Sequence, residues 1–222
     1  MTDTCPLLTN HPISFVRKGS KDHLLIIITG EQAFPGYLHA VSPEDASILT
    51  ISVPDWNRDL SPWPEKACFK GSEAFRGEAK AFLRAIQDDI LPKAERALGL
   101  ENPVRSITGY SLAGLFALYA MFETELFTNC ASVSGSLWYE GFLDYIKKRK
   151  EAKERKIVYL SLGDREELTR NERLSKVGVC TKETAEILKG LKYEARFEYN
   201  KGNHFFEPEK RMLRAIDFIF KK

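Results

Sequence analysis

The stretch Thr108-Gly109-Tyr110-Ser111-Leu112-Ala113-Gly114 decides how this chain of 222 residues is interpreted. The β-branched run Val104–Thr108 leads into it and predicts a buried strand. The run Leu112–Phe122 follows it, and because this run is apolar nearly all round it predicts a buried helix. Ser111 therefore lies where a strand turns into a helix, beside the free N–H groups of the helix N-terminus.

This strand–serine–helix pattern is typical of a nucleophile elbow, in which a strained turn presents a serine at the edge of a sheet. Small residues two positions before and two positions after the serine, Gly109 and Ala113, allow strand and helix to approach closely. The motif departs from Gly-x-Ser-x-Gly because Ala113 replaces the second glycine. Taken alone, the motif fits equally well a serine that caps a buried helix.

The same alternation of strand and helix patterns runs along the whole chain. Further strands are predicted from apolar or alternating runs at Ile13–Val16, Leu24–Ile28, Ser47–Val53, Ala131–Val133, Ile157–Leu162 and Tyr193–Tyr199. Further helices are predicted at Ser72–Leu98 (kinked or ended by Pro92), Phe142–Lys156, Thr181–Lys189 and Phe206–Phe220. Such alternation predicts an α/β fold of six or seven strands, mostly parallel, with helices on both faces. Ligands of such sheets bind at the carboxyl ends of the strands.

Length and composition favour one α/β domain over residues 1–222. Hydrophobic residues make up 43% and charged residues 29%, as in ordinary globular proteins. The formal net charge of +2 gives no reason to expect nucleic acid or an anionic membrane as a partner. No uninterrupted apolar run approaches the roughly 18 residues that a membrane-spanning helix needs, so no membrane span is expected. Four cysteines without a paired spacing, and no apolar leader, favour a cytoplasmic location.

A histidine and an acidic residue follow the serine in the order that a catalytic triad of this fold requires. His204 is the one histidine after Ser111, and it follows the sixth predicted strand in Gly202-Asn203-His204-Phe205. The alternative is a histidine without a catalytic role near a helix start. For the acid, three carboxylates follow the fifth strand: Glu166, which a Gly-x-x-acid turn selects, then Asp164, then Glu167. Position alone does not choose among them.

Two backbone donors and two tryptophans complete the expected site. The oxyanion of an acyl-transfer reaction needs two N–H groups, and we expect them from Leu112 and from Glu31, which follows the first central strand. Trp138 and Trp63 fall in loops at the same edge and are candidates for a substrate pocket, although core packing explains them equally well. The sequence contains no phosphate-binding glycine motif and no paired histidine spacing, so we expect no cofactor and no metal.

Several stretches together resemble the putative-esterase family of the α/β-hydrolase superfamily, which includes enterochelin, siderophore and feruloyl esterases. The resembling stretches are residues 53–64, with Arg-Asp-Leu-Ser-Pro-Trp-Pro, residues 109–114, residues 132–139, with Ser-Gly-Ser-Leu-Trp, residues 160–166 and residues 202–205. The resemblance implies Ser111 as the nucleophile, His204 as the base, and Glu166 or Asp164 as the acid. The chain is shorter than most members, so we expect little or no lid and an open pocket.

The sequence therefore predicts a serine-dependent hydrolase of carboxylic esters, with a small-molecule ester as substrate and an acyl-enzyme as intermediate. An acyltransferase with the same triad is the first alternative. A catalytically inactive hydrolase fold that serves as a binding protein is the second. Edge strands that are open to pairing make a homodimer a candidate assembly.

Overall fold

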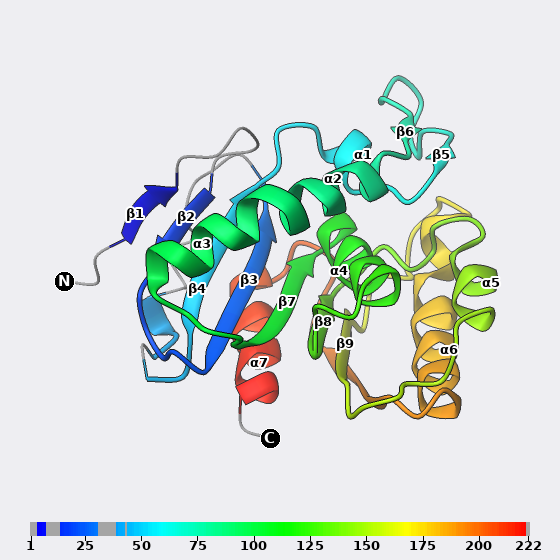
Figure 1. The fold of residues 1–222 in the computed structure, drawn as a ribbon. Helices are drawn as coiled ribbons and strands as arrows, with labels where there is room; N and C mark the ends of the chain where they lie inside the picture. Colours follow the sequence, from blue (N-terminus) through cyan, green and yellow to red (C-terminus); the bar gives the residue numbers. More distant parts are fainter. Residues whose placement is uncertain (1–3, 8–13, 31–38, 43, 221–222) are drawn as a thin grey trace.

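Eight strands form one twisted sheet in the computed structural model, which describes residues 4–7, 14–30, 39–42 and 44–220 (Figure 1). Their spatial order is β1-β2-β4-β3-β7-β8-β9-β10. The strands are β1 (Thr4–Leu7), β2 (Ser14–Arg17), β3 (His23–Thr29), β4 (Ser47–Ser52), β7 (Val104–Tyr110), β8 (Asn129–Val133), β9 (Ile157–Gly163) and β10 (Glu194–Asn200). The six strands from β4 to β10 pair in parallel, whereas β2 and β1 are antiparallel.

The parallel sheet confirms the α/β fold that the alternation predicts. Its central strands are buried on both faces, as residues 24–27 of β3 show, since each of them is 0% exposed. The prediction of six or seven strands is one short, because β1 extends the sheet beyond the predicted edge strand. A separate small sheet of β5 (Pro64–Glu65) and β6 (Phe75–Arg76) was also not predicted, since two-residue strands leave no periodic signal.

Helices cover both faces of the sheet, as predicted (Figure 1). On one face, α2 (Ala79–Ala85), α3 (Leu91–Leu98), α4 (Leu112–Glu123), α5 (Phe142–Lys147) and α6 (Val177–Gly190) enclose the larger core. On the other face, α7 (Pro208–Phe220) packs its apolar side against β7, β8 and β9. The short helix α1 (Trp56–Asp59) and the 3₁₀ turn η3 (Leu174–Lys176) lie in the loops that follow β4 and β9.

The long helix expected over Ser72–Leu98 begins later than predicted and is not ended by its proline. Phe75, which falls inside the predicted helix, lies instead in β6, and the helix begins at Ala79. Pro92 lies in the first turn of α3, directly after a π-helical turn, η2 (Ile86–Ile90). In a π turn the backbone hydrogen bonds span five residues instead of four, and this local change accommodates Pro92, which has no N–H. The helix then continues until Gly99 caps it.

The helix expected over Phe142–Lys156 ends at Lys147, so that prediction is wrong for its second half. Phe142 and Ile146 are buried, but the basic run that follows has no comparable apolar face to pack against the core. Packing of an apolar face supplies most of the stability of a helix in a protein, and the helix stops where that face ends.

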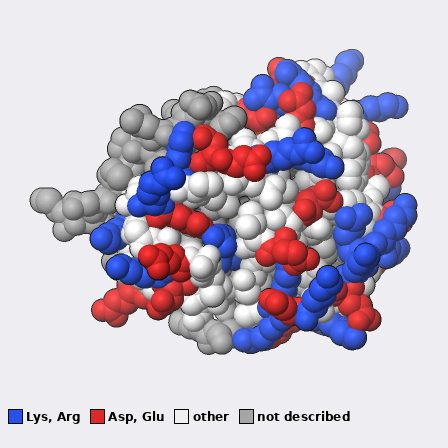
Figure 2. Space-filling model, viewed as in Figure 1, with Lys and Arg blue, Asp and Glu red and all other residues white. Residues whose placement is uncertain are grey.

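Charged side chains of both signs alternate over the visible surface (Figure 2). Many of them form ion pairs, for example Lys147 with Glu183 and Arg149 with Glu123. Within the described ranges, no helix is both long enough and apolar enough to cross a lipid bilayer.

Candidate active site

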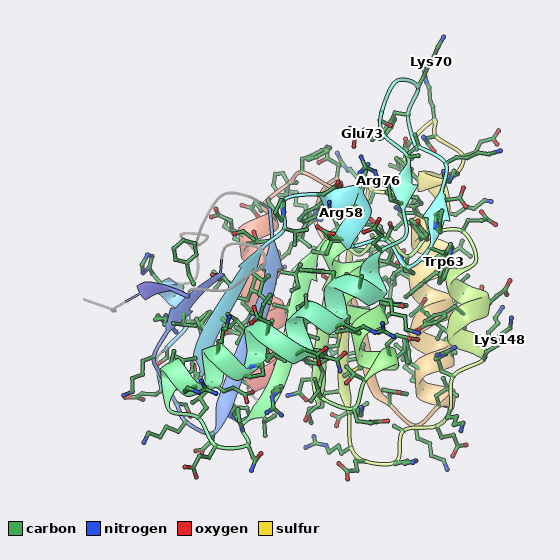
Figure 3. The ribbon with its side chains drawn as sticks, turned by 45° about the horizontal axis from the view of Figure 1, so that its top comes forward. Arg58, Trp63, Lys70, Glu73, Arg76 and Lys148 are labelled. Carbon is green, nitrogen blue, oxygen red and sulfur yellow. The ribbon has the colours of Figure 1, made fainter. Side chains whose placement is uncertain are left out.

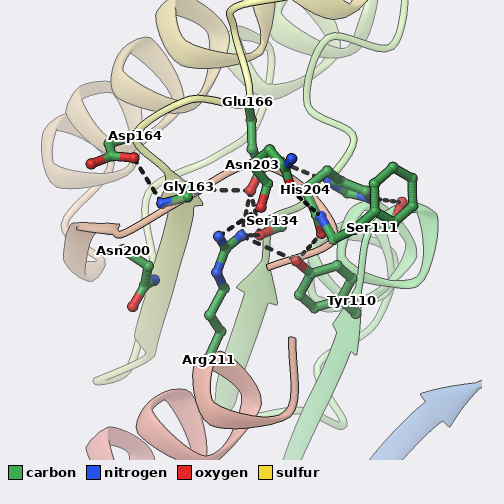
Figure 4. A network of polar contacts seen from close by, with 12 residues as sticks. Tyr110, Ser111, Ser134, Gly163, Asp164, Glu166, Asn200, Asn203, His204 and Arg211 are labelled. Atoms are coloured by element: carbon green, nitrogen blue, oxygen red, sulfur yellow. Dashed lines mark hydrogen bonds and ion pairs between the residues drawn. The ribbon is translucent and has the colours of Figure 1, made fainter. Parts of the chain in front are cut away.

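Ser111 lies in the turn between β7 and α4, at the carboxyl edge of the sheet (Figure 4). Its backbone dihedrals are φ 62° and ψ −124°. Positive φ is unfavourable for a residue with a side chain, and such conformations cluster at functional sites. The Ser111 side chain makes no capping hydrogen bond to α4, so its hydroxyl is not used by the helix that it begins.

Small residues on both sides of Ser111 make this turn possible. A Cβ atom on Gly109 would lie 2.6 Å from atoms of Ala113, and one on Gly114 would lie 3.0 Å from the Gly109 carbonyl oxygen. Ala113 is completely buried between strand and helix. Alanine therefore serves where the motif usually has its second glycine, and the close approach expected from the sequence is present.

His204 reaches Ser111 from the loop that follows β10. Its Nε2 atom lies 3.0 Å from Ser111 Oγ. The imidazole packs between two rings, with centroid distances of 5.2 Å to Tyr110 and 5.3 Å to Phe205. The Tyr110 hydroxyl also donates a hydrogen bond of 2.6 Å to the His204 carbonyl oxygen. Burial raises the pKa of this phenol, which keeps it protonated as a donor.

Of the three carboxylates after β9, the structure brings Glu166 to the histidine. Glu166 Oε2 lies 2.7 Å from His204 Nδ1. Asp164 instead accepts a 2.8 Å hydrogen bond from the Gly202 backbone N–H. The Glu167 carboxylate lies against Gly178 in α6. Position in the sequence left this choice open, and the geometry favours Glu166.

Glu166 is held as a carboxylate by its surroundings. Its side chain is only 3% exposed, and burial alone raises a carboxyl pKa. Hydrogen bonding and charge from His204, the Gly163 N–H and the Ser134 hydroxyl outweigh burial, so the pKa of Glu166 falls below its usual value. The Gly163 N–H and the Ser134 hydroxyl each donate a 2.7 Å hydrogen bond to Oε1. The carboxylate is therefore ionised at neutral pH and fixed at both oxygens.

The sequence interpretation missed Arg211, which joins the site from α7. Its guanidinium lies 2.7 Å from Glu166 Oε1 and is almost completely buried (Figure 4). A signal for it does exist in the sequence. Arg211 lies four residues before Ala215 and one before Met212, both on the buried face of α7, so a charged residue occupies an apolar stripe.

A cavity of about 560 Å³ opens in front of Ser111 and His204. Its interior is largely apolar, and the apolar residues that line it include Trp56, Phe75, Trp138, Leu174 and Val177. Part of its wall is the loop between β5 and β6, which contributes Glu73 to the lining and whose Lys70 extends away from the sheet in Figure 3. A cavity of this size and lining is suited to a small organic molecule.

Three exposed apolar side chains from three different segments form the rim of this cavity. Phe69, Leu168 and Phe205 line it and are 59%, 75% and 85% exposed, respectively. Exposed large apolar side chains that gather around a cavity mark a binding surface. The rim is therefore suited to contact an apolar part of a ligand that extends out of the cavity.

The two tryptophans proposed for the pocket differ in position. Trp138 lines the cavity, whereas Trp63 is not among the described residues that do so. Trp63 donates its indole N–H to the Glu140 carbonyl oxygen at 3.0 Å and packs against Tyr139 and Tyr145. The pocket assignment of Trp63 is therefore corrected: its ring belongs to an aromatic cluster that packs on the core.

Of the two expected oxyanion donors, Leu112 lies within the residues that the structure describes and Glu31 does not. Leu112 is the first residue of α4 and lines the cavity beside Ser111, so its N–H belongs to the helix turn that lacks intrahelical acceptors. Glu31 lies outside the described residues. Across the described ranges, no group of three or more His, Cys, Asp or Glu side chains is arranged to hold a metal ion.

The fold and the arrangement at the sheet edge define the class of protein as an α/β hydrolase. The model of the family described as "Putative esterase" matches residues 28–208, which include Ser111, Glu166 and His204. The chain belongs to this family.

Individual relatives are distant in sequence and close in fold. The chain is 28% identical over 126 residues to the uncharacterized protein YbbA of Bacillus subtilis, a match that covers 54% of this chain and only about half, 50%, of that protein. It is similar in structure to an IroE-like serine hydrolase from Shewanella oneidensis, with a TM-score of 0.81, 16% identity, and coverage of 100% of this chain and 80% of that one. It is also similar to the siderophore hydrolase EstA from Aspergillus nidulans, with a TM-score of 0.74, 15% identity, and coverage of 99% and 94%.

Proposed function

We propose that this chain hydrolyses carboxylic esters through Ser111 as nucleophile, His204 as general base and Glu166 as the carboxylate that orients the base. One observation carries the proposal. Ser111 Oγ, the two nitrogens of His204 and Glu166 Oε2 form a continuous chain with steps of 3.0 Å and 2.7 Å. The Ser111 end of this hydrogen-bonded series lies at a cavity that can admit an ester. The arrangement has the hydrogen-bond distances that general-base activation of a serine requires.

In the acylation step, Ser111 Oγ attacks the ester carbonyl carbon while its proton moves to His204 Nε2. The carbonyl oxygen becomes an oxyanion, which the Leu112 N–H stabilises, a contribution of about 3 kcal/mol per donor in serine hydrolases. The C–O bond to the alcohol then breaks, and the leaving alkoxide takes the proton from Nε2. The product of this step is an alcohol and an acyl-serine.

In the deacylation step, a water molecule gives a proton to His204 Nε2 as its oxygen attacks the acyl carbon. The second tetrahedral intermediate collapses, the carboxylic acid leaves, and the proton returns to Ser111 Oγ. Glu166 stays ionised throughout. It holds Nδ1 in the protonated form, so that Nε2 is free to accept the serine proton, and it stabilises the imidazolium that forms.

The lining of the cavity supports an ester with an apolar or aromatic group as the substrate. Trp138, Trp56 and Phe75 provide ring surfaces inside the cavity, and the three rim residues extend this apolar surface outward. Siderophore esters are one candidate substrate, because two siderophore hydrolases of Aspergillus nidulans, EstA and EstB, share this fold. We expect a small-molecule substrate of this kind.

The test is hydrolysis of p-nitrophenyl esters from acetate to octanoate by wild type, Ser111→Ala and His204→Ala. A control variant, Ser132→Ala, removes the hydroxyl of a buried serine on β8 that does not line the cavity. We expect both site variants to lose activity by a factor of about 10⁴ or more, as triad residues do, and the control to keep it. Wild-type activity in Ser111→Ala would refute the proposal. Transfer of the acyl group to added alcohols in preference to water would identify an acyltransferase. A folded protein that does not react with a fluorophosphonate would identify an inactive binding protein.

A further inference from the structure

Arg211 is a buried cation whose guanidinium contacts the proposed catalytic acid. It lies in the first turn of α7 and its side chain is 2% exposed. Its Nη1 atom lies 2.7 Å from Glu166 Oε1, 2.9 Å from Ser134 Oγ and 3.1 Å from the Tyr110 hydroxyl oxygen (Figure 4). A buried charge is stable only where it is paired and hydrogen-bonded, and this guanidinium meets both conditions.

The other end of the same guanidinium holds the loop that carries the histidine. Arg211 Nη2 donates hydrogen bonds to the carbonyl oxygens of Lys201, at 3.0 Å, and Asn203, at 2.8 Å. Asn203 directly precedes His204. One planar side chain therefore contacts the acid with one nitrogen and the backbone beside the base with the other, and only an arginine has this fork geometry.

The chain leaves room for this guanidinium at Gly163, the last residue of β9. A Cβ atom at this position would lie 2.6 Å from Arg211 Nη2 and 3.0 Å from Nη1, and it would also collide with the Gly202 carbonyl oxygen. The Gly163 N–H itself donates to Glu166 Oε1. Glycine is thus required where the acid loop, the histidine loop and the guanidinium meet.

We propose that Arg211 is a positioning residue of the reaction, an inference that rests on the proposed function. It occupies Glu166 Oε1 and so leaves Oε2 directed at His204, and it fixes the histidine loop at the matching distance. It also offsets part of the negative charge of Glu166. The imidazolium formed during the reaction is therefore stabilised by the carboxylate but not so strongly that His204 stays protonated.

One consequence distinguishes this role from simple structural support. Without the cation, His204 faces a carboxylate whose charge is not offset, so it binds a proton more readily. A protonated imidazole cannot act as base, and the acid side of the pH–rate profile then moves to higher pH. Among the described residues, the charged or titratable groups next to His204 or its loop include Glu166, the Tyr110 phenol, Asp164 and Arg165 beside Gly202, and Arg211 itself.

The test compares Arg211→Gln, Arg211→Lys and a matched control, Arg214→Gln. Arg214 lies one turn further along α7, is exposed, and donates to the Asn200 side chain without touching Glu166 or His204. We expect Arg211→Gln to lower kcat for p-nitrophenyl acetate by about 100-fold through misplaced groups, with KM changed less than about threefold. We expect the acid limb of the pH profile of kcat/KM, on which activity rises with pH, to move to higher pH by about one unit. Arg211→Lys keeps the cation, so its limb should stay near that of wild type while kcat remains reduced.

The inference is overturned if Arg211→Gln matches Arg214→Gln in kcat and in the acid limb. It is also overturned if both Arg211 variants lose kcat equally and neither moves the limb, because that result indicates structural support alone. A second readout needs no turnover: the hydrogen-bonded Nδ1 proton of His204 in the ¹H NMR spectrum. This proton signal should shift or vanish in Arg211→Gln and stay unchanged in Arg214→Gln. The NMR measurement therefore tests the positioning role of Arg211 even if esterase activity is absent. Should Arg211→Gln fail to fold, kcat of Arg211→Lys decides instead, because a reduced value is expected there and a wild-type kcat overturns the proposal.

Discussion

Replacement of Glu166 by glutamine tests which carboxylate serves His204. The matched variant is Asp164→Asn, in the same loop and two residues away. Both changes remove one negative charge and keep the shape of the side chain. Glu166 contacts His204 Nδ1 at 2.7 Å, whereas Asp164 contacts only the Gly202 N–H, at 2.8 Å. The two variants therefore differ in the one contact that the mechanism requires.

The expected loss follows from how the glutamine amide would sit. Arg211, Ser134 and the Gly163 N–H surround Oε1 with donors, so the amide oxygen takes that position. The amide NH₂ group is then directed at His204 Nδ1, which must become the acceptor. The imidazole proton moves to Nε2, which can no longer accept the proton of Ser111. This wrong tautomer lowers kcat by about 10⁴ in the serine proteases, roughly 5.5 kcal/mol at about 1.36 kcal/mol for each factor of ten.

The assay is kcat/KM for p-nitrophenyl acetate, normalised to the concentration of folded protein in each sample. Circular dichroism checks that each variant is folded. We expect Glu166→Gln to lose about three to four orders of magnitude, and Asp164→Asn to lose less than about threefold, as for an exposed loop residue. The assignment of Glu166 is wrong if its variant keeps more than about a tenth of the wild-type kcat/KM, or if Asp164→Asn falls equally far.

Three further changes test the turn, the rim and the charge of the site. Gly109→Ala would place a Cβ atom 2.6 Å from Ala113, so we expect a loss of about 1–3 kcal/mol in unfolding free energy, measured in urea; unchanged stability would show that the turn is not tight. Phe205→Ala should lower the octanoate-to-acetate ratio of kcat/KM by about tenfold, the value of roughly two buried methylenes at about 0.8 kcal/mol each, and an unchanged ratio would exclude the rim as an acyl contact. Because the pKa of Glu166 is lowered on folding, its contribution to stability is present above the usual glutamate pKa and is lost as pH falls through the folded value. The stability difference between wild type and Glu166→Gln should therefore shrink in acid, and a difference that is constant between pH 7 and pH 3 would contradict this.

Much of the fold could be predicted because its strands carry a strong local signal. A central parallel strand is buried on both faces, so its residues are almost all apolar, as in β3 and β9. Helix boundaries were less predictable. Phe75 has the spacing of a helical residue but pairs in β6, and the helix continues past Pro92 after a π turn.

Within the site, the position of Ser111 and the candidates around it could be predicted from the sequence alone. The strand–turn–helix pattern with Gly109 and Ala113 is local, and the order of serine, acid and histidine follows from the order of the strands. These features need only neighbouring residues and the alternation of elements, which a sequence contains directly.

Only the tertiary structure decided which carboxylate meets His204, that Arg211 joins it, and that Trp138 rather than Trp63 lines the cavity. Glu166 and His204 are 38 residues apart, and Glu166 and Arg211 are 45 apart. Their contacts arise because β7, β9 and β10 run parallel and release their loops at one edge, against which α7 begins. The direction of each side chain at that edge depends on packing between these distant segments, and no local pattern in the sequence encodes it.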